Sequence, residues 1–251
     1  MKLKRLVKLN DIKTYYCEAA DGKIGPYEDI YFDAYRFAVR FLLVDTQQWL
    51  PERKVILSPF TVGAIDDQNQ LVYIELAQHQ IKNSPPLATD QPVSRQYEEQ
   101  YFKYYGWPPY WDSLSWPNTL RVRASDISAS LPHRTLSSHI ENHLHRASKI
   151  LGYSVALTEG PIGKLNDFVI DTHYWVVRYM EIDTRNWLDH KNFSLITPSM
   201  ILGIDWPEKR ISVDVSRKTL QNAPPYDANE PISRDYESRL LKYYGEVNYW
   251  K

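Results

Sequence analysis

The sequence predicts a mainly β protein with a few helices, built as two tandem small antiparallel β-barrels, each followed by a C-terminal α-helix and an aromatic tail. Three observations predict it: an internal duplication, short apolar runs at close spacing, and one tyrosine-rich segment near the end of each copy. The chain has 251 residues, of which 43% are hydrophobic and 24% charged. This size and composition are typical of two globular domains of ordinary size.

The duplication is visible as a constant offset between the two halves. An offset of 138 residues aligns the early parts of the copies, and an offset of 139 aligns the later parts. KYYGWPPYW at 103–111 matches KYYGEVNYW at 242–250. The predicted organisation is a first repeat at 1–111 (barrel to about 81, helix and tail 92–111), a connector at 112–140, and a second repeat at 141–251 (barrel to about 220, helix and tail 231–250).

The barrels are predicted from strand-like runs. DFVIDTHYWVVRYMEID at 167–183 contains two β-branched and aromatic runs hinged at Asp171 and Thr172, which indicates a hairpin. The second run is apolar on both faces, as expected of a central strand. Three short runs follow at 194–199, 201–205 and 211–216, and the first copy has its own at 54–59, 62–66 and 71–76. Short strands at this spacing favour a small barrel or sandwich.

A helix is predicted near the end of each repeat. Ser94 and Ser233 are expected to cap these helices, because a serine oxygen can accept from an otherwise unpaired first-turn N–H. Gly106 and Gly245 suit the left-handed residue that ends a helix. Tyrosines at helical spacing, with one leucine in the second copy, mark one face of each helix: Tyr97, Tyr101, Tyr104 and Tyr105 in the first copy, and Tyr236, Leu240, Tyr243 and Tyr244 in the second.

Four segments of the chain resemble the PRC-barrel family, whose members include the cytoplasmic domain of the photosynthetic reaction-centre H subunit and the C-terminal domain of the ribosome maturation factor RimM. They are DGKIGPYEDIYFD, VDTQQWLPERKVILSP, EGPIGKLNDFVID and IDTRNWLDHKNFSLITP. The resemblance covers about 75 residues of each repeat. It implies a strongly bent antiparallel barrel used mainly for protein interaction, without a catalytic site.

The leading hypothesis is therefore a non-enzymatic interaction or scaffold protein with an unidentified protein partner and no cofactor. Two alternatives stay open: a cytoplasmic-side accessory of a photosynthetic or membrane electron-transfer complex, and a small-ligand or metal-binding stress protein. The formal net charge of −1 argues against nucleic acid as the main partner. Without an apolar run of spanning length or a secretory leader, the sequence favours a cytoplasmic protein that lacks a transmembrane segment. It leaves homo-oligomerisation open.

The aromatic tails supply the candidate interaction surface, because tryptophan and tyrosine are favoured at the centres of protein interfaces. In a second interpretation, these rings cover a barrel mouth or the connector instead. The candidate residues are Trp107, Tyr110, Trp111, Tyr249 and Trp250.

HIENHLH at 139–145 offers His139, His143 and His145 as metal ligands, although the first repeat has no histidine at the matching positions. Its more common interpretation is a structural segment at the start of the second repeat. Cys17 is the single cysteine, and only a chance three-dimensional approach of His79 would activate its thiol.

Two acid pairs recur in both copies, Asp29 with Asp33 and Asp167 with Asp171. They could perform acid–base chemistry or hold a cation, but aspartates at strand ends more often bind the N–H groups of a turn. Arg40 and Arg178 lie among apolar strand residues. Each is expected to pair with an acid such as Asp29 or Asp167, because an unpaired buried guanidinium is costly.

Overall fold

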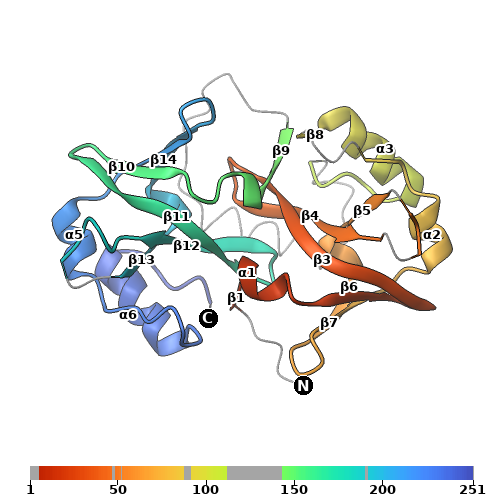
Figure 1. Ribbon diagram of the computed structural model, residues 1–251, viewed down its shortest axis with the longest axis horizontal. Coiled ribbons are helices and arrows are strands. Elements are labelled where there is room, and N and C mark those ends of the chain that lie inside the picture. Colours follow the sequence, from red (N-terminus) through yellow and green to blue (C-terminus); the bar gives the residue numbers. More distant parts are fainter. Residues whose placement is uncertain are drawn as a thin grey trace.

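The computed structural model describes residues 6–46, 49–51, 53–87, 92–111, 143–189 and 192–250. The predicted connector at 112–140, and His139 within it, lie outside the described residues. Figure 1 shows two lobes side by side, with the long strands of each lobe meeting at the centre and most of the helices on the outer sides.

In the described part of the first half, seven strands precede the helix α2. In chain order its elements are β1 (Leu6–Lys8), α1 (Leu9–Ile12), β2 (Tyr16–Ala19), β3 (Gly22–Asp33), β4 (Ala38–Asp45), β5 (Lys54–Leu57), η1 (Pro59–Thr61), β6 (Val62–Asp66), β7 (Leu71–Ile74), α2 (Gln78–Lys82), β8 (Val93–Ser94) and α3 (Arg95–Tyr105).

The second half follows nearly the same order. Its elements are β9 (His143–Arg146), η2 (Ala147–Lys149), β10 (Ser154–Leu157), β11 (Gly160–Asp171), β12 (Val176–Asp183), β13 (Phe193–Ile196), η3 (Pro198–Met200), β14 (Ile201–Asp205), β15 (Arg210–Val213), α5 (Arg217–Asn222) and α6 (Arg234–Tyr244). Most of these elements start 138 or 139 residues after their first-half equivalents. The predicted hairpin at 167–183 is the β11–β12 pair.

The mainly β class is confirmed, with five α-helices in the described part of the chain. Separate closed barrels are not established, because the main strand path is open and runs from β14 at one edge to β6 at the other. The pairing is also not wholly antiparallel: β2 runs parallel to β7, and β10 runs parallel to β15. Four strands lie between the two members of each parallel pair in the chain, so no hairpin forces them to run antiparallel.

The lead segments of the two halves are exchanged. β1, at the start of the first half, pairs with β11 of the second half, where Lys8 lies opposite Val169. β9, at the start of the second half, pairs with β3 of the first, where Arg146 lies opposite Tyr31. These pairs are equivalent under the 138-residue offset, so the halves are related by an internal pseudo-twofold axis.

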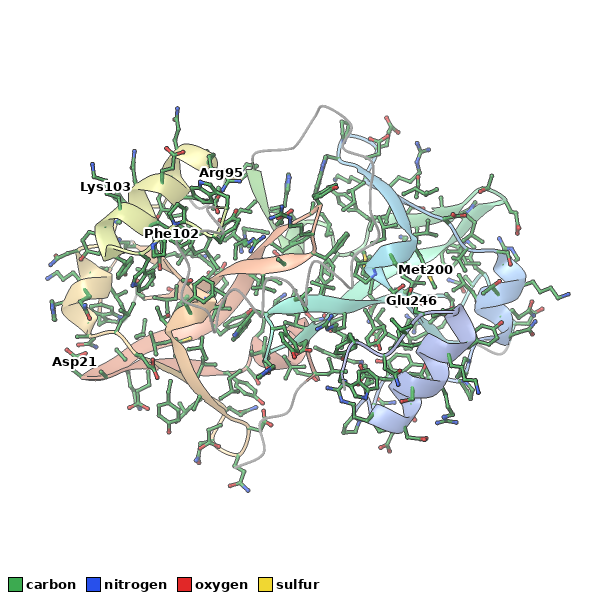
Figure 2. The ribbon with its side chains drawn as sticks, turned by 180° about the vertical axis from the view of Figure 1, so that it is seen from behind. Asp21, Arg95, Phe102, Lys103, Met200 and Glu246 are labelled. Carbon is green, nitrogen blue, oxygen red and sulfur yellow. The ribbon has the colours of Figure 1, made fainter. Side chains whose placement is uncertain are left out.

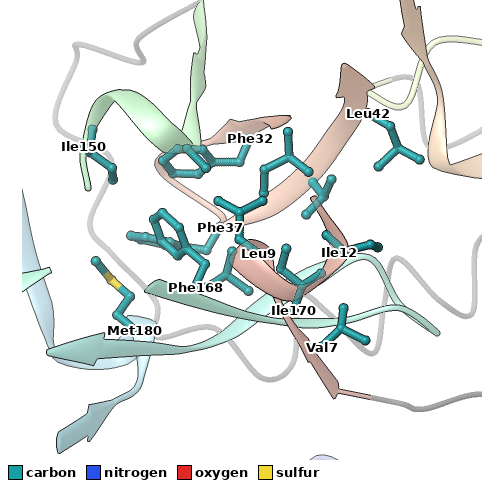
Figure 3. Packing of buried hydrophobic residues seen from close by; sticks show 14 of the residues in the cluster. Val7, Leu9, Ile12, Phe32, Phe37, Leu42, Ile150, Phe168, Ile170 and Met180 are labelled. Carbon is teal, nitrogen blue, oxygen red and sulfur yellow. The ribbon is translucent and has the colours of Figure 1, made fainter. Parts of the chain in front are cut away.

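The two halves also meet directly at this axis. Val39 donates its N–H to the carbonyl of Trp175 at 2.8 Å, and Val177 donates to the carbonyl of Phe37 at the same distance. Beneath these bonds the ring centres of Phe32 and Phe168 lie 5.4 Å apart. One hydrophobic core therefore runs through both halves, as the packing in Figure 3 shows.

Both predicted C-terminal helices are present with the expected ends. The Ser94 hydroxyl accepts from the Tyr97 N–H at 3.3 Å, and the Ser233 hydroxyl accepts from the Tyr236 N–H at 3.1 Å. Each helix ends at a glycine in the left-handed region, with φ of 67° and 75°. Each helix packs on the strands of its own half through a separate cluster of buried side chains.

Close backbone packing explains one repeated glycine and yields a prediction. A Cβ on Gly25 would lie 1.7 Å from the carbonyl oxygen of Asp45. The φ angle of Gly25, 155°, also disfavours residues other than glycine. We expect Gly25→Ala to destabilise the protein by about 3 kcal/mol or more, since over-packing of a tight core forces backbone shifts. Gly203→Ala, where nothing lies within 4 Å of the added atom, is the control. Equal urea midpoints for the two variants would contradict the packing argument.

Candidate functional site

The aromatic tail of the first half folds back onto α3 and β4. The guanidinium carbon of Arg40 lies 3.8 Å from the centre of the Tyr110 ring, and that of Arg95 lies 3.9 Å from the centre of the Trp111 ring. Both distances are typical of cation–π contacts. The two rings also contact Phe102, so the tail is half-buried and held by one arginine from the sheet and one from the helix.

The second half repeats this clamp. Arg178 lies 3.6 Å from the centre of the Tyr249 ring, and Arg234 lies 4.1 Å from that of Trp250. Tyr249 and Trp250 are half-buried as well. The structure thus brings the predicted interaction residues together within each half, where they pack against arginines that the sequence analysis did not assign to them.

A buried glutamate lies beneath each tail. Glu98 of α3 and Glu237 of α6 are both almost completely buried. Burial raises the pKa of both carboxyl groups, that of Glu98 to about 7, because the charged form loses its solvation. The sequence analysis missed both residues, although charged residues repeated at the same place on a helix with an aromatic face are a usable signal.

The tails differ at their first residue. Trp107 stacks on Tyr105 with ring centres 4.5 Å apart. Its equivalent in the second half is Glu246, which accepts a hydrogen bond from Thr197 at 2.5 Å and another from Ser199. The first tail is thus attached to its half by a ring stack where the second is attached by a carboxylate.

The junction between the halves holds one of the predicted acids. Asp29 is fully buried on β3 and accepts from Arg146 Nε at 3.0 Å, from the Ser148 N–H at 3.2 Å and from the Ser148 hydroxyl. Arg146 also contacts Glu28 at 2.8 Å. Asp29 therefore anchors the lead segment of the second half.

Asp167, the equivalent residue in the second half, receives fewer hydrogen bonds from the opposite half than Asp29 does. It accepts from the Asn10 N–H at 3.3 Å, while Lys8 pairs with Glu181 at 2.6 Å instead. Burial, followed by the nearby charge of Glu181, raises the pKa of Asp167 to about 7. Asp29 and Asp167 thus bind the opposite half, and the prediction that both acids of each pair serve turns is wrong for these two.

Asp33 and Asp171 do bind turns. Asp33 accepts from the N–H groups of Tyr35 and Arg36, at 2.9 and 3.0 Å. Asp29 and Asp33 lie four residues apart on β3 and reach different partners: Asp29 binds the lead segment of the second half, and Asp33 binds the turn that follows β3.

The strand arginines pair with these turn acids. Arg40 contacts Asp33 and Arg178 contacts Asp171, both at 3.2 Å. The expectation of an acidic partner is confirmed, but the suggested partners Asp29 and Asp167 are wrong. Each arginine lies near the hairpin end, where Asp33 or Asp171 is closer.

The candidate metal and thiol residues do not form a site in the described part of the chain. His145 stacks on Trp206 with ring centres 3.7 Å apart, and the side chain of His143 lies outside the described residues. Among the described residues, no three potential ligands converge to hold a metal ion. Burial raises the pKa of the Cys17 thiol to about 12, the opposite of activation, and His79 is exposed.

An exposed tyrosine pair, missed by the sequence analysis, lies on the outer face of the first half. Tyr16 on β2 and Tyr73 on β7 are 37% and 38% exposed, and both face away from the core because Cys17 and Val72 between them are fully buried. The equivalent positions in the second half are Ser154 and Ser212, so this aromatic face belongs to one half only.

The packing of the tails gives a second prediction. We expect Trp250→Ala to lower the free energy of unfolding by about 1–3 kcal/mol, less than for a full core aromatic, because the ring is half-buried and held by Arg234. Val247→Ala, in the same tail but 87% exposed, is expected to have no effect. Chemical unfolding measures both, and equal stabilities would show that the ring does not pack.

Comparison of the chain with protein-family models and with curated proteins finds no match. Within the described ranges, none of the helices has the length and apolar character needed to cross a bilayer.

Proposed function

We propose that the protein is a non-enzymatic interaction or scaffold protein composed of two PRC-barrel-type modules fused into one pseudo-symmetric unit. Support comes from the resemblance of both repeats to that family and from the way the predicted site residues are used. Asp29, Asp33, Arg40 and their equivalents join the halves and close turns, which are structural tasks.

The observation that carries the proposal is the tyrosine pair on β2 and β7. Tyr16 and Tyr73 expose apolar rings on a sheet face whose second-half equivalents are serines. Tyrosine contributes strongly to protein interfaces because it brings a large rigid ring with a polar end. A duplicated unit that keeps its core but differs at such a face is well suited to bind one partner through one half.

A pull-down with the tagged full chain tests this function. Soluble and detergent-extracted membrane fractions are analysed separately by mass spectrometry, with wild type, a Tyr16→Ser/Tyr73→Ser double variant and a Leu202→Ser control. Leu202 is 60% exposed, but lies in the second half. The proposal expects a stoichiometric partner that the wild type and the control retain and the double variant loses.

The other outcomes are also informative. A partner found only in the membrane fraction would favour the accessory of a membrane electron-transfer complex over a soluble scaffold. A partner retained equally by all three proteins would move the interaction away from the tyrosine face and towards the tails with Trp107, Tyr110 and Trp111. The absence of any stoichiometric partner would overturn the proposed function.

A further inference from the structure

The buried Glu98 is poorly satisfied. Its side chain is 1% exposed, and neither carboxylate oxygen receives a hydrogen bond of good geometry, although the Tyr110 hydroxyl interacts with the carboxylate. The nearest cation is Arg95 one helical turn earlier, with Nη1 at 3.2 Å from Oε2. Figure 2 marks Arg95 on the same helix. An ionised carboxylate in this position is costly, because the few nearby dipoles do not replace the water that it has lost.

The equivalent glutamate of the second half, Glu237, has more hydrogen-bond donors than Glu98. Glu237 accepts from the Tyr179 hydroxyl at 3.0 Å, from the Tyr249 hydroxyl at 2.5 Å and from Arg234 at 2.6 Å. The first-half equivalent of Tyr179 is Phe41, which has no hydroxyl to donate. The two glutamates therefore occupy equivalent positions beneath equivalent tails, but Glu98 lacks the hydroxyl that Tyr179 provides to Glu237.

Charged and titratable groups from each neighbouring element face Glu98. Arg95 lies on its own helix, Tyr110 in the tail, Arg40 on β4 and Asp33 on β3. Arg40 is already paired with Asp33 at 3.2 Å. Arg95 and, to a smaller extent, Arg40 are left to balance an ionised Glu98, and Arg95 also supports a ring of the tail.

We propose that Glu98 is a proton-operated latch of the first aromatic tail, which closes over α3 when the carboxyl is protonated and loosens when it ionises. The Tyr110 hydroxyl interacts with this carboxyl, and the rings of Tyr110 and Trp111 both lie against its arginine. Arg95 contacts Glu98 at 3.2 Å and the Trp111 ring at 3.9 Å, so a movement that admits water to the carboxylate disturbs the arginine that holds this ring.

The direction of the pH effect follows from burial. The pKa of Glu98 is raised from 4.5 to about 7 in the closed state, so closure binds a proton. Closure is therefore strongest at low pH, and the opening equilibrium rises by up to about tenfold per pH unit as pH increases from about 4.5 to about 7. The second tail, whose glutamate has three donors, is expected to respond less.

Hydrogen exchange of the full chain between pH 5 and 8 tests the latch, with protection factors corrected for intrinsic rates. The segment 103–111 is expected to lose at least about tenfold in protection over this range, and 242–250 distinctly less. A carboxyl carbon NMR titration of Glu98 in the wild type is expected to give a midpoint near 7. A midpoint near 4.5, or identical responses of the two tails, would overturn the proposal.

Reciprocal variants separate the latch from general loosening of the structure. Phe41→Tyr supplies the missing donor and is expected to reduce the pH response of the first tail, whereas Tyr179→Phe is expected to confer one on the second. Glu98→Gln should remove the response of the first tail, and Glu237→Gln is its matched control. A pH response that persists in Glu98→Gln would contradict the latch.

Discussion

Phe168→Ala is expected to lower the free energy of unfolding by about 3–5 kcal/mol, the range for removing a large aromatic side chain from a core. Phe168 is fully buried on β11 and lies against Phe32 of β3. Because this contact joins the two halves, we expect both halves to become less stable. Urea unfolding followed by far-UV circular dichroism measures the change.

A matched control for this substitution lies in the same core but within one half. Val72→Ala removes a smaller buried side chain from β7, and we expect it to cost about 1–3 kcal/mol. If Phe168→Ala cost no more than Val72→Ala, the contact between Phe32 and Phe168 would contribute little beyond ordinary burial.

Arg146→Ala is expected to destabilise the protein by about 3 kcal/mol, because it leaves the fully buried Asp29 without its cation. Thermal unfolding at pH 7 measures the loss.

The control for this prediction is an exposed ion pair of similar chemistry. Arg185 contacts Asp183 at 2.6 Å, but its side chain is 58% exposed. Arg185→Ala is expected to change stability by less than about 0.5 kcal/mol, because solvent screens such pairs. Similar losses of stability for Arg146→Ala and Arg185→Ala would show that the ion pair between Arg146 and Asp29 contributes no more than an exposed ion pair.

Local structure could be predicted from the sequence where one short segment determines it. The hairpin at Asp171, the helix starts at Ser94 and Ser233 and the helix ends at Gly106 and Gly245 each depend on a turn or capping residue and its immediate neighbours. Because the two halves have similar sequences, a prediction made for one half also applies to the other.

The arrangement of the halves could not be predicted in this way. β1 and β9 are short strands without a turn signal that fixes their partner, and an internal repeat is equally consistent with pairing inside one half. The roles of Asp29 and Arg146 depend on that exchange, so a local interpretation assigned Asp29 to a turn. Glu98 was missed for a related reason, since its burial depends on how the tail folds back.

The central claim is that reciprocal exchange of lead segments makes the two halves one cooperative unit. Hydrogen exchange pulse labelling across a urea series, on wild type and Phe168→Ala, tests it most directly. We predict that β4 and β12 lose protection at the same urea concentration, and that the substitution lowers both midpoints together. A variant in which β12 unfolds early while β4 keeps its wild-type midpoint would contradict the account.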